Sequence, residues 1–295
     1  MIFGRSGSLK TAAAILTVSL TVGVCGASAG GSAPRRSAPK HHVVVAFFGD
    51  SLSLTLGIAL AAPKLESQYD YTLLNGAILG CGVADGPLVE VQGKVDITAS
   101  ACRGTPPPPG SPLTLQPWPT QWQHLLSTDH PNVGVLLAGR WEVVNRTYRG
   151  KWTNILNPVY ARYVKRQLEL ASHLVTASGA RMVFLTAPCI QGTPQPDGAP
   201  WPEDSLTRLH EYNRLVKQVA ARYPKTDSVV DLNSLVCPDD KFSADYKGVV
   251  VRQPDGVHFS IGAGGVLENP LMTNILASGR SQIVQLIKHK TGKSK

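Results

Sequence analysis

The stretch that decides the fold is residues 43–52, Val43-Val44-Val45-Ala46-Phe47-Phe48-Gly49-Asp50-Ser51-Leu52. Its apolar, partly β-branched start is typical of a strand that is buried on both faces. Beyond Ser51, apolar residues recur at helical spacing, at Leu54, Ile58, Ala61 and Ala62. The stretch therefore predicts a strand, a tight turn and a helix, with Ser51 at the turn. Open α/β sheets bind ligands at this edge, and a helix N-terminus favours negative charge. Ser51 is thus a candidate nucleophile, although serine is also an ordinary N-cap residue.

A second polar cluster, Asp255-Gly256-Val257-His258, follows the last candidate strand. A serine nucleophile needs a base, and the base needs an acid that orients it. Imidazole titrates near neutrality, so His258 suits the role of base. No other histidine has an acidic residue three positions earlier in a loop after a strand. We therefore predict that Ser51, His258 and Asp255 form a catalytic triad; the alternative for Asp255 is a simple turn residue before Gly256.

Three motifs resemble those of the SGNH, or GDSL, hydrolase family. Gly49-Asp50-Ser51-Leu52 resembles its first block, Asp255-x-x-His258 its last, and Asn75-Gly76-Ala77-Ile78-Leu79-Gly80 a middle block. The resemblance covers roughly residues 43–290. It implies a serine esterase whose oxyanion is bound by the backbone N–H groups of Ser51 and Gly80.

A third family block, Gly-x-Asn-Asp, contributes an asparagine as a further oxyanion donor, and the chain departs from it. The corresponding segment reads Leu137-Ala138-Gly139-Arg140-Trp141-Glu142. Arg140 or Trp141 stands about where the asparagine would be, and Asn145 is another candidate. We predict that Arg140 contributes to the oxyanion site; the alternative is an ion pair between Arg140 and Glu142 or another acid. The Arg-Trp pair resembles the SGNH domains attached to membrane O-acyltransferases that acetylate envelope sugars.

Strands and helices alternate along the rest of the chain. The predicted strands are 43–48, 71–75, 133–138, 181–187 and 228–232; the predicted helices run from Ser51 to about 66, over 158–178 and over about 203–223, with two short helical stretches after His258. Residues 81–124 lack strong periodicity, and their centre, 104–119, has four consecutive prolines and is expected to hold no regular element. This long loop begins beside Gly80 and is expected to form a wall of the site. The pattern predicts an α/β fold, a three-layer α/β/α sandwich around a mostly parallel, roughly five-stranded, flavodoxin-like sheet.

The first 29 residues predict a secretory signal peptide. Arg5 and Lys10 give a basic start, Thr11 to Val24 is apolar, and Ala27-Ser28-Ala29 is a plausible cleavage site. Lipidation of Cys25 is an alternative, but Val24 before it is bulkier than such a site normally tolerates. We expect a mature chain that begins near Gly30, with a flexible lead-in over 30–42 and one SGNH-like domain over 43–295.

Four cysteines remain after cleavage, namely Cys81, Cys102, Cys189 and Cys237. An even number in an exported protein indicates two disulfides, with three possible pairings. We favour Cys81–Cys102, which brackets a loop, and Cys189–Cys237, which lies after two candidate neighbouring strands. Free buried thiols are the alternative. The spacing suits no metal site, and no cofactor is expected.

The chain of 295 residues is basic, with a formal net charge of +9. No basic stripe is interleaved with aromatic residues, so we expect no nucleic-acid partner. Weak attraction to an acidic cell envelope is a possible use of the charge. Taken together, we expect a secreted, monomeric serine esterase that cleaves O-acyl esters, above all O-acetyl esters, on a carbohydrate or envelope glycan. The alternatives are an O-acyltransferase that uses the same triad and a catalytically silent glycan-binding domain.

Overall fold

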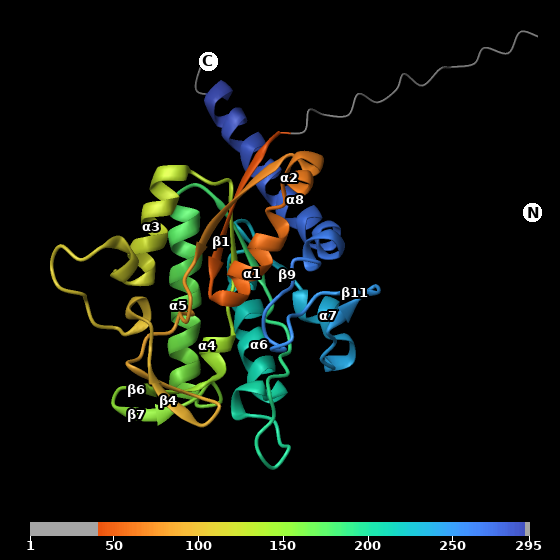
Figure 1. Ribbon diagram of the computed structural model, residues 1–295. Helices are drawn as coiled ribbons and strands as arrows, with labels where there is room; N and C mark the ends of the chain where they lie inside the picture. Colours follow the sequence, from red (N-terminus) through yellow and green to blue (C-terminus); the bar gives the residue numbers. More distant parts are fainter. Residues whose placement is uncertain (1–40, 293–295) are drawn as a thin grey trace, which may run out of the picture. The chain divides into compact units, whose positions relative to one another are not determined.

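A five-stranded parallel sheet lies at the centre of the computed structural model, which describes residues 41–292 (Figure 1). Its strands are β2 (Tyr71–Ala77), β1 (Val43–Gly49), β5 (Val133–Leu137), β8 (Arg181–Leu185) and β9 (Asp227–Val230), in that spatial order. Every neighbouring pair is parallel. The predicted signal peptide, and the predicted lead-in up to residue 40, lie outside the described residues.

Helices cover both faces of this sheet. One face carries α1 (Ser51–Leu60) and α8 (Ala263–Gly292), and the other carries α3 (Trp118–Asp129), α5 (Pro158–Ala177) and α6 (Leu206–Arg222) (Figure 1). Glycines allow close packing on each face: Gly279 of α8 lies against Val43 and Val133, and Gly134 of β5 lies against Val175 of α5. The predicted three-layer α/β/α sandwich is therefore confirmed.

The strand order places a topological switch at β1. The chain continues from β1 to β2 on one side and later returns to β5 on the other side. Ligands of open α/β sheets bind outside the carboxyl ends of the strands at such a point. At this end of β1, Gly49 has a φ of +130°, and a Cβ there would lie 1.8 Å from the carbonyl oxygen of Leu137. Only glycine permits this approach, which brings the ends of β1 and β5 together.

A second, antiparallel sheet was not predicted. It contains β4 (Lys94–Ile97), β3 (Leu88–Val91), β6 (Asn145–Tyr148) and β7 (Lys151–Thr153), in that order. These strands have three or four residues each, too few for an alternating pattern to stand out in the sequence. They connect the segment after Gly80 with the segment after Arg140, and so they link two regions of the predicted site.

Three predicted element boundaries were wrong. Pro63 divides the expected helix 51–66 into α1 and α2 (Pro63–Tyr69), because proline is favoured in a first helical turn. After His258 a single helix, α8, replaces the two expected short ones, and it contains Pro270. Within the proline-rich 104–119, the chain forms the 3-10 turn η2 (Leu113–Leu115) and begins α3 at Trp118. The remaining short elements are η1 (Ser100–Cys102), α4 (Arg140–Val143), η3 (Pro202–Asp204), α7 (Leu232–Val236), η4 (Pro238–Asp240), β10 (Asp245–Tyr246) and β11 (Val249–Val250).

Both predicted disulfides are present. Cys81 and Cys102 are joined with their Cα atoms 5.6 Å apart, and Cys189 and Cys237 with theirs 6.1 Å apart. All four residues are buried. Among the described residues, no helix has both the length and the apolar character needed to span a membrane.

Candidate active site

Ser51 is the first residue of α1 and follows directly on β1. Asp50 caps the helix, since its Oδ1 accepts a hydrogen bond of 2.9 Å from the N–H of Leu52. The cap places the Ser51 side chain at the carboxyl edge of the sheet. No acceptor among the described residues binds the N–H of Ser51, as expected in a first helical turn.

Ser51, His258 and Asp255 form one hydrogen-bonded chain. The distance between Ser51 Oγ and His258 Nε2 is 2.8 Å, and the distance between His258 Nδ1 and Asp255 Oδ2 is 2.6 Å. The next residue is also tied to α1, because the N–H of Phe259 donates to Thr55 Oγ1 at 3.2 Å. The structure thus brings together the three residues that the sequence analysis selected, in the order that proton transfer from a serine requires.

Asp255 is held as a carboxylate. Partial burial acts to raise its pKa, but the hydrogen bonds from the His258 side chain and from the N–H groups of His258 and Val257 outweigh burial and hold the pKa below its usual value. The two N–H bonds to Oδ1 measure 2.8 Å from Val257 and 3.0 Å from His258. A fixed carboxylate selects the tautomer of His258 in which Nε2 is free to accept a proton.

Arg252 holds the loop that carries His258 in place. This guanidinium is 1% exposed and donates to the carbonyl of Val257 and to the carbonyl of Cys189, each at 2.8 Å. Burial lowers the pKa of Arg252 to about 10, and the charge of Asp255 opposes that shift, so the group is cationic at neutral pH. Arg252 could not be identified from the sequence, because both of its acceptors are main-chain atoms, which no sequence motif marks.

Gly80, the second predicted oxyanion donor, lies at the carboxyl edge beyond β2. The N–H of Ile78 donates to the carbonyl of Gly49 at 2.8 Å, which fastens this segment to β1. Gly80 has a φ of +68°, and its N–H has no acceptor among the described residues. A Cβ at Gly80 would lie 3.7 Å from Ala99, and the Cys81–Cys102 disulfide closes the same contact. The residue of the following loop that contacts the Gly80 position is therefore Ala99, which precedes the proline-rich stretch.

The geometry disfavours the predicted role of Arg140. Its guanidinium is buried and pairs with Asp204 Oδ1 at 2.5 Å and with Glu203 Oε1 at 3.5 Å. Both acids come from η3, more than sixty positions along the chain. Because two carboxylates bind this guanidinium, we no longer assign Arg140 to the oxyanion. The alternative, an ion pair with an acid, is present, and the acids are Asp204 and Glu203 rather than Glu142. The other candidate, Asn145, donates its amide to Glu90 at 2.9 Å.

Glu142 instead stabilises the segment that follows Gly80. Its Oε1 accepts from the N–H groups of Val83, at 2.6 Å, and Ala84, at 3.3 Å. Arg146, also fully buried, donates to the carbonyls of Ala84 and Trp141. Together these two buried side chains hold α4 against residues 80–84. The sequence did not reveal this link, because its partners are again main-chain atoms.

A buried carboxyl group lies directly beside the candidate nucleophile. Burial raises the pKa of Asp50 from its ordinary value of 3.8 to about 8; nearby Glu142 adds to the shift, while the N–H groups of Leu52 and Ser53 oppose it. Asp50 Oδ2 has no hydrogen-bond partner among the described residues. An unpaired buried oxygen is tolerated far better on a neutral carboxylic acid than on a carboxylate. Asp50 is therefore protonated at neutral pH.

We expect this proton to make stability depend on pH. Between about pH 4 and pH 8 the folded chain keeps a proton on Asp50 that the unfolded chain releases, so the free energy of unfolding falls as pH rises and levels off above pH 8. Asp50→Asn keeps the capping oxygen and has no charge, so the fall should become shallower. Urea unfolding at pH 5, 6.5 and 8 measures this, with exposed Asp129→Asn as the control. An equally steep fall in Asp50→Asn would contradict the assignment.

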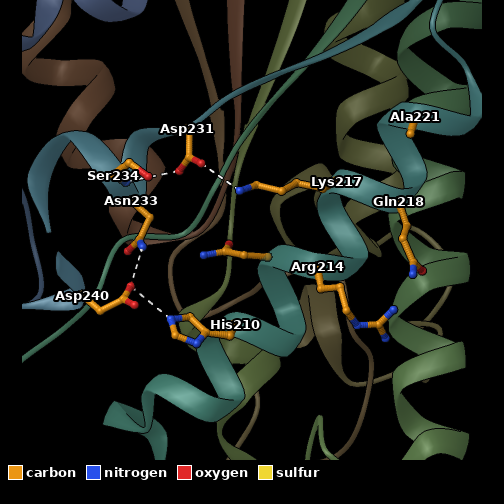
Figure 2. A pocket seen from close by; sticks show the side chains of 10 residues that line it. His210, Arg214, Lys217, Gln218, Ala221, Asp231, Asn233, Ser234 and Asp240 are labelled. Carbon is orange, nitrogen blue, oxygen red and sulfur yellow. Dashed lines mark hydrogen bonds and ion pairs between the residues drawn. The ribbon is translucent and has the colours of Figure 1, made fainter. Parts of the chain in front are cut away.

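A prominent hollow lies away from these residues. It has a volume of about 550 Å³, lies between α6 and α7, and includes none of the three triad residues in its lining. Figure 2 shows two pairs among its lining side chains, Lys217 with Asp231 at 2.8 Å and His210 with Asp240 at 3.1 Å. The lining residue Arg214 pairs with Glu211 at 2.6 Å. Because each of these side chains has a partner, none of them is an unpaired charge for a ligand.

No protein-family model matches the chain, and no curated protein matches it. Solved structures do. One solved chain, 17% identical with a TM-score of 0.51, covers 80% of this chain and 97% of its own length. At this identity the likeness is one of fold.

Several named structures are similar at lower TM-scores. An SGNH hydrolase from Slackia heliotrinireducens is 16% identical, with a TM-score of 0.45, and covers 78% of this chain and 97% of its own. A GDSL-like lipase from Bacteroides thetaiotaomicron is 13% identical, with a TM-score of 0.44 and coverage of 79% and 87%. The periplasmic domain of a lipopolysaccharide acetyltransferase from Salmonella ser. Paratyphi A is 11% identical, with a TM-score of 0.45 and coverage of 80% and 85%.

Proposed function

We propose that this chain is a secreted serine esterase of the SGNH type, which cleaves O-acyl esters through an acyl-enzyme. The observation that supports this proposal most is the hydrogen-bonded chain from Ser51 Oγ through His258 to Asp255. A serine hydroxyl is a weak nucleophile until a base within hydrogen-bond reach takes its proton. His258 Nε2 lies within that reach, 2.8 Å from Ser51 Oγ.

The first half-reaction forms the acyl-enzyme. Ser51 Oγ attacks the ester carbonyl carbon while its proton passes to His258 Nε2, and the carbonyl π electrons move onto oxygen. When the tetrahedral intermediate collapses, the carbon–oxygen bond to the alcohol breaks and the alkoxide leaves with the proton from His258. Water then repeats the sequence, giving its proton to His258 and returning Ser51 with release of the carboxylic acid. Asp255 stabilises the imidazolium in both halves without exchanging a proton.

The negative charge on the carbonyl oxygen needs donors already aimed at it. The N–H groups of Ser51 and Gly80 supply two of them in the proposal. Each lies at the carboxyl edge of its strand, and neither has an acceptor among the described residues. The Cys81–Cys102 disulfide and Glu142 hold the Gly80 segment in place. Fixed main-chain donors require no reorganisation during the reaction.

For the substrate we propose an O-acyl group, above all O-acetyl, on a carbohydrate or cell-envelope glycan. The Arg140-Trp141 pair and the two cysteine pairs support this, through their resemblance to SGNH domains attached to envelope O-acyltransferases. Exposure of the triad supports it as well. The side chains of His258 and Asp255 are 29% and 44% exposed, so an ester on a bulky glycan can reach them from solvent.

An O-acyltransferase is the second candidate. The same resemblance of Arg140-Trp141 favours it, and the triad chemistry is identical until a sugar hydroxyl, rather than water, attacks the acyl-enzyme. A silent glycan-binding domain is less favoured, because a binding surface does not require the short hydrogen bonds of Ser51, His258 and Asp255.

Export is part of the proposal. Two buried disulfides are typical of proteins that fold in oxidising compartments. We propose that residues 1–29 direct export and that the mature, monomeric chain begins near Gly30. Its basic charge would favour weak attraction to an acidic envelope.

Intact-mass measurement tests these proposals together. Secreted protein is exposed to a panel of acetylated sugars and short aryl esters, with Ser51→Ala as the matched control. We expect the mass of a chain that begins near Gly30, plus an acyl adduct in the wild type alone. Loss of the adduct in buffer indicates an esterase, and loss only on adding a sugar indicates a transferase. An adduct on Ser51→Ala, or no adduct and no turnover with any ester, would overturn the proposed chemistry.

A further inference from the structure

Trp141 occupies the position of the missing asparagine when the third block is counted from its glycine. In Gly139-Arg140-Trp141-Glu142, Trp141 is the third residue, as the asparagine is in Gly-x-Asn-Asp. We propose that the indole N–H of Trp141 is the third oxyanion donor, beside the N–H groups of Ser51 and Gly80. This inference rests on the proposed esterase chemistry and adds a catalytic residue to it.

The other two candidate side chains of this region are already paired with acids. Two carboxylates bind the guanidinium of Arg140, at 2.5 Å and 3.5 Å, and Glu90 binds the amide of Asn145 at 2.9 Å. Redirecting either group would leave a buried or half-buried acid without its partner, which is unfavourable. The indole N–H of Trp141 is not bound to an acid or to any other acceptor among the described residues.

The Nε1 atom of Trp141 is shielded from solvent and has no hydrogen-bond partner among residues 41–292. Indole N–H groups usually find an acceptor when they are buried, so an unpaired one lowers the stability of the folded chain. Such a donor is understandable where an acceptor arrives with the substrate. Polar groups kept ready for developing charge in a poorly solvated place are the main source of oxyanion stabilisation.

The indole lies beside Gly80. Its Cζ2 atom is 3.9 Å from the position that a Cβ on Gly80 would take. Cζ2 is bonded to the ring carbon that carries Nε1, so the edge of the ring next to Gly80 is the edge that bears the N–H group. The indole therefore contacts the Gly80 position through the side of the ring that includes Nε1. We expect an acyl oxygen bound at Gly80 to be the acceptor that the indole N–H lacks.

The main chain of Trp141 is fixed on both sides. Its carbonyl accepts from the buried Arg146 at 3.0 Å, and the adjacent Glu142 binds the N–H groups of Val83 and Ala84. These bonds connect α4 to the segment that begins at Gly80. The indole is thus positioned relative to Gly80 by rigid, buried contacts, as a preorganised donor requires.

Two replacements at position 141 test the donor. Trp141→Phe removes the N–H and retains an aromatic ring. 3-Benzothienylalanine, placed at 141 alone by stop-codon suppression, keeps the shape of tryptophan and puts sulfur in place of N–H. For both we expect kcat on a short aryl ester to fall about 10²- to 10³-fold, as when one oxyanion donor is lost. KM should change little, and the affinity for a boronic acid, which forms a tetrahedral anion on Ser51, should fall by the same factor as kcat. Trp152→Phe, an exposed tryptophan on β7, should match the wild type.

The outcomes separate this inference from the proposed function. Wild-type kcat in the sulfur analogue would overturn the role of Trp141 and leave the esterase proposal intact. The same holds if the loss appears only in KM, or if the sulfur analogue binds the boronic acid as tightly as the wild type does. A folded wild type without turnover, and without acylation of Ser51, would overturn both.

Discussion

Ser51→Ala is expected to lower the hydrolysis of a short aryl ester by about 10⁴- to 10⁶-fold, since Oγ is the atom that forms the acyl bond. His258→Ala should lower the rate of hydrolysis about as much, because Ser51 then lacks the base that lies 2.8 Å from its Oγ atom. The double variant should be about as active as either single variant, because the losses of rate from residues that act as one catalytic unit are not additive. Steady-state kinetics on variants shown to be folded by circular dichroism measures this.

Asp255→Asn should retain more activity than Ser51→Ala, because Asp255 orients and stabilises His258 without bonding to the substrate. Ser53→Ala is the matched control: Ser53 lies on the same helix, and its hydroxyl binds only the carbonyl of Phe48, at 2.8 Å. It should lose about 1 kcal/mol of stability and keep its activity. If folded Ser51→Ala retains near wild-type turnover while Ser53→Ala does not, the nucleophile has been misassigned.

Arg252→Met is expected to lower both stability and activity. The variant leaves the carbonyls of Val257 and Cys189 without their donor inside the protein, so the free energy of unfolding should fall by about 3 kcal/mol. The loop that carries His258 loses its anchor, and small displacements of a catalytic group can reduce kcat about 10- to 100-fold. KM on a small ester should change far less, because Arg252 lies beneath the loop and is not exposed.

Urea unfolding and steady-state kinetics measure the two effects of Arg252→Met separately. Arg222→Met is the control, since Arg222 is 62% exposed on α6 and makes a 3.4 Å contact with Glu169 and a cation–π contact with the Tyr223 ring at 5.9 Å, both away from the His258 loop. Arg252→Lys retains the charge, but its single ammonium cannot donate to both carbonyls as the planar guanidinium does. Its free energy of unfolding and its kcat should therefore lie between those of the wild type and of Arg252→Met. If Arg252→Met is as stable and as active as Arg222→Met, the loop does not depend on this anchor.

The parts of the molecule that could be predicted are those encoded by short, local patterns. The apolar run before Gly49 predicts β1, and the turn Gly49-Asp50-Ser51 predicts the position of the serine. Asp255 and His258 lie three positions apart in one loop, so their contact is also local. Parity predicted two disulfides with three possible pairings. The loop between Cys81 and Cys102, and the strands that precede Cys189 and Cys237, favoured the pairing that the structure has.

The parts that escaped prediction depend on distant or main-chain partners. Arg140 pairs with Asp204, 64 positions away, across a loop whose course no periodicity reveals. Glu142, Arg146 and Arg252 bind main-chain groups, which every residue carries and no motif marks. The antiparallel sheet was missed because its strands are short and because β3 pairs with β6 across 55 to 57 positions.

The hydrogen bond between Ser51 and His258 joins residues 207 positions apart. All five strands of the central sheet are complete by Val230, well before His258. The entropy of closing so long a loop opposes this contact until packed elements hold both ends in place. During synthesis the nucleophile therefore leaves the ribosome long before its base does. On the proposed mechanism, a nascent chain that already has its whole sheet is still chemically inert.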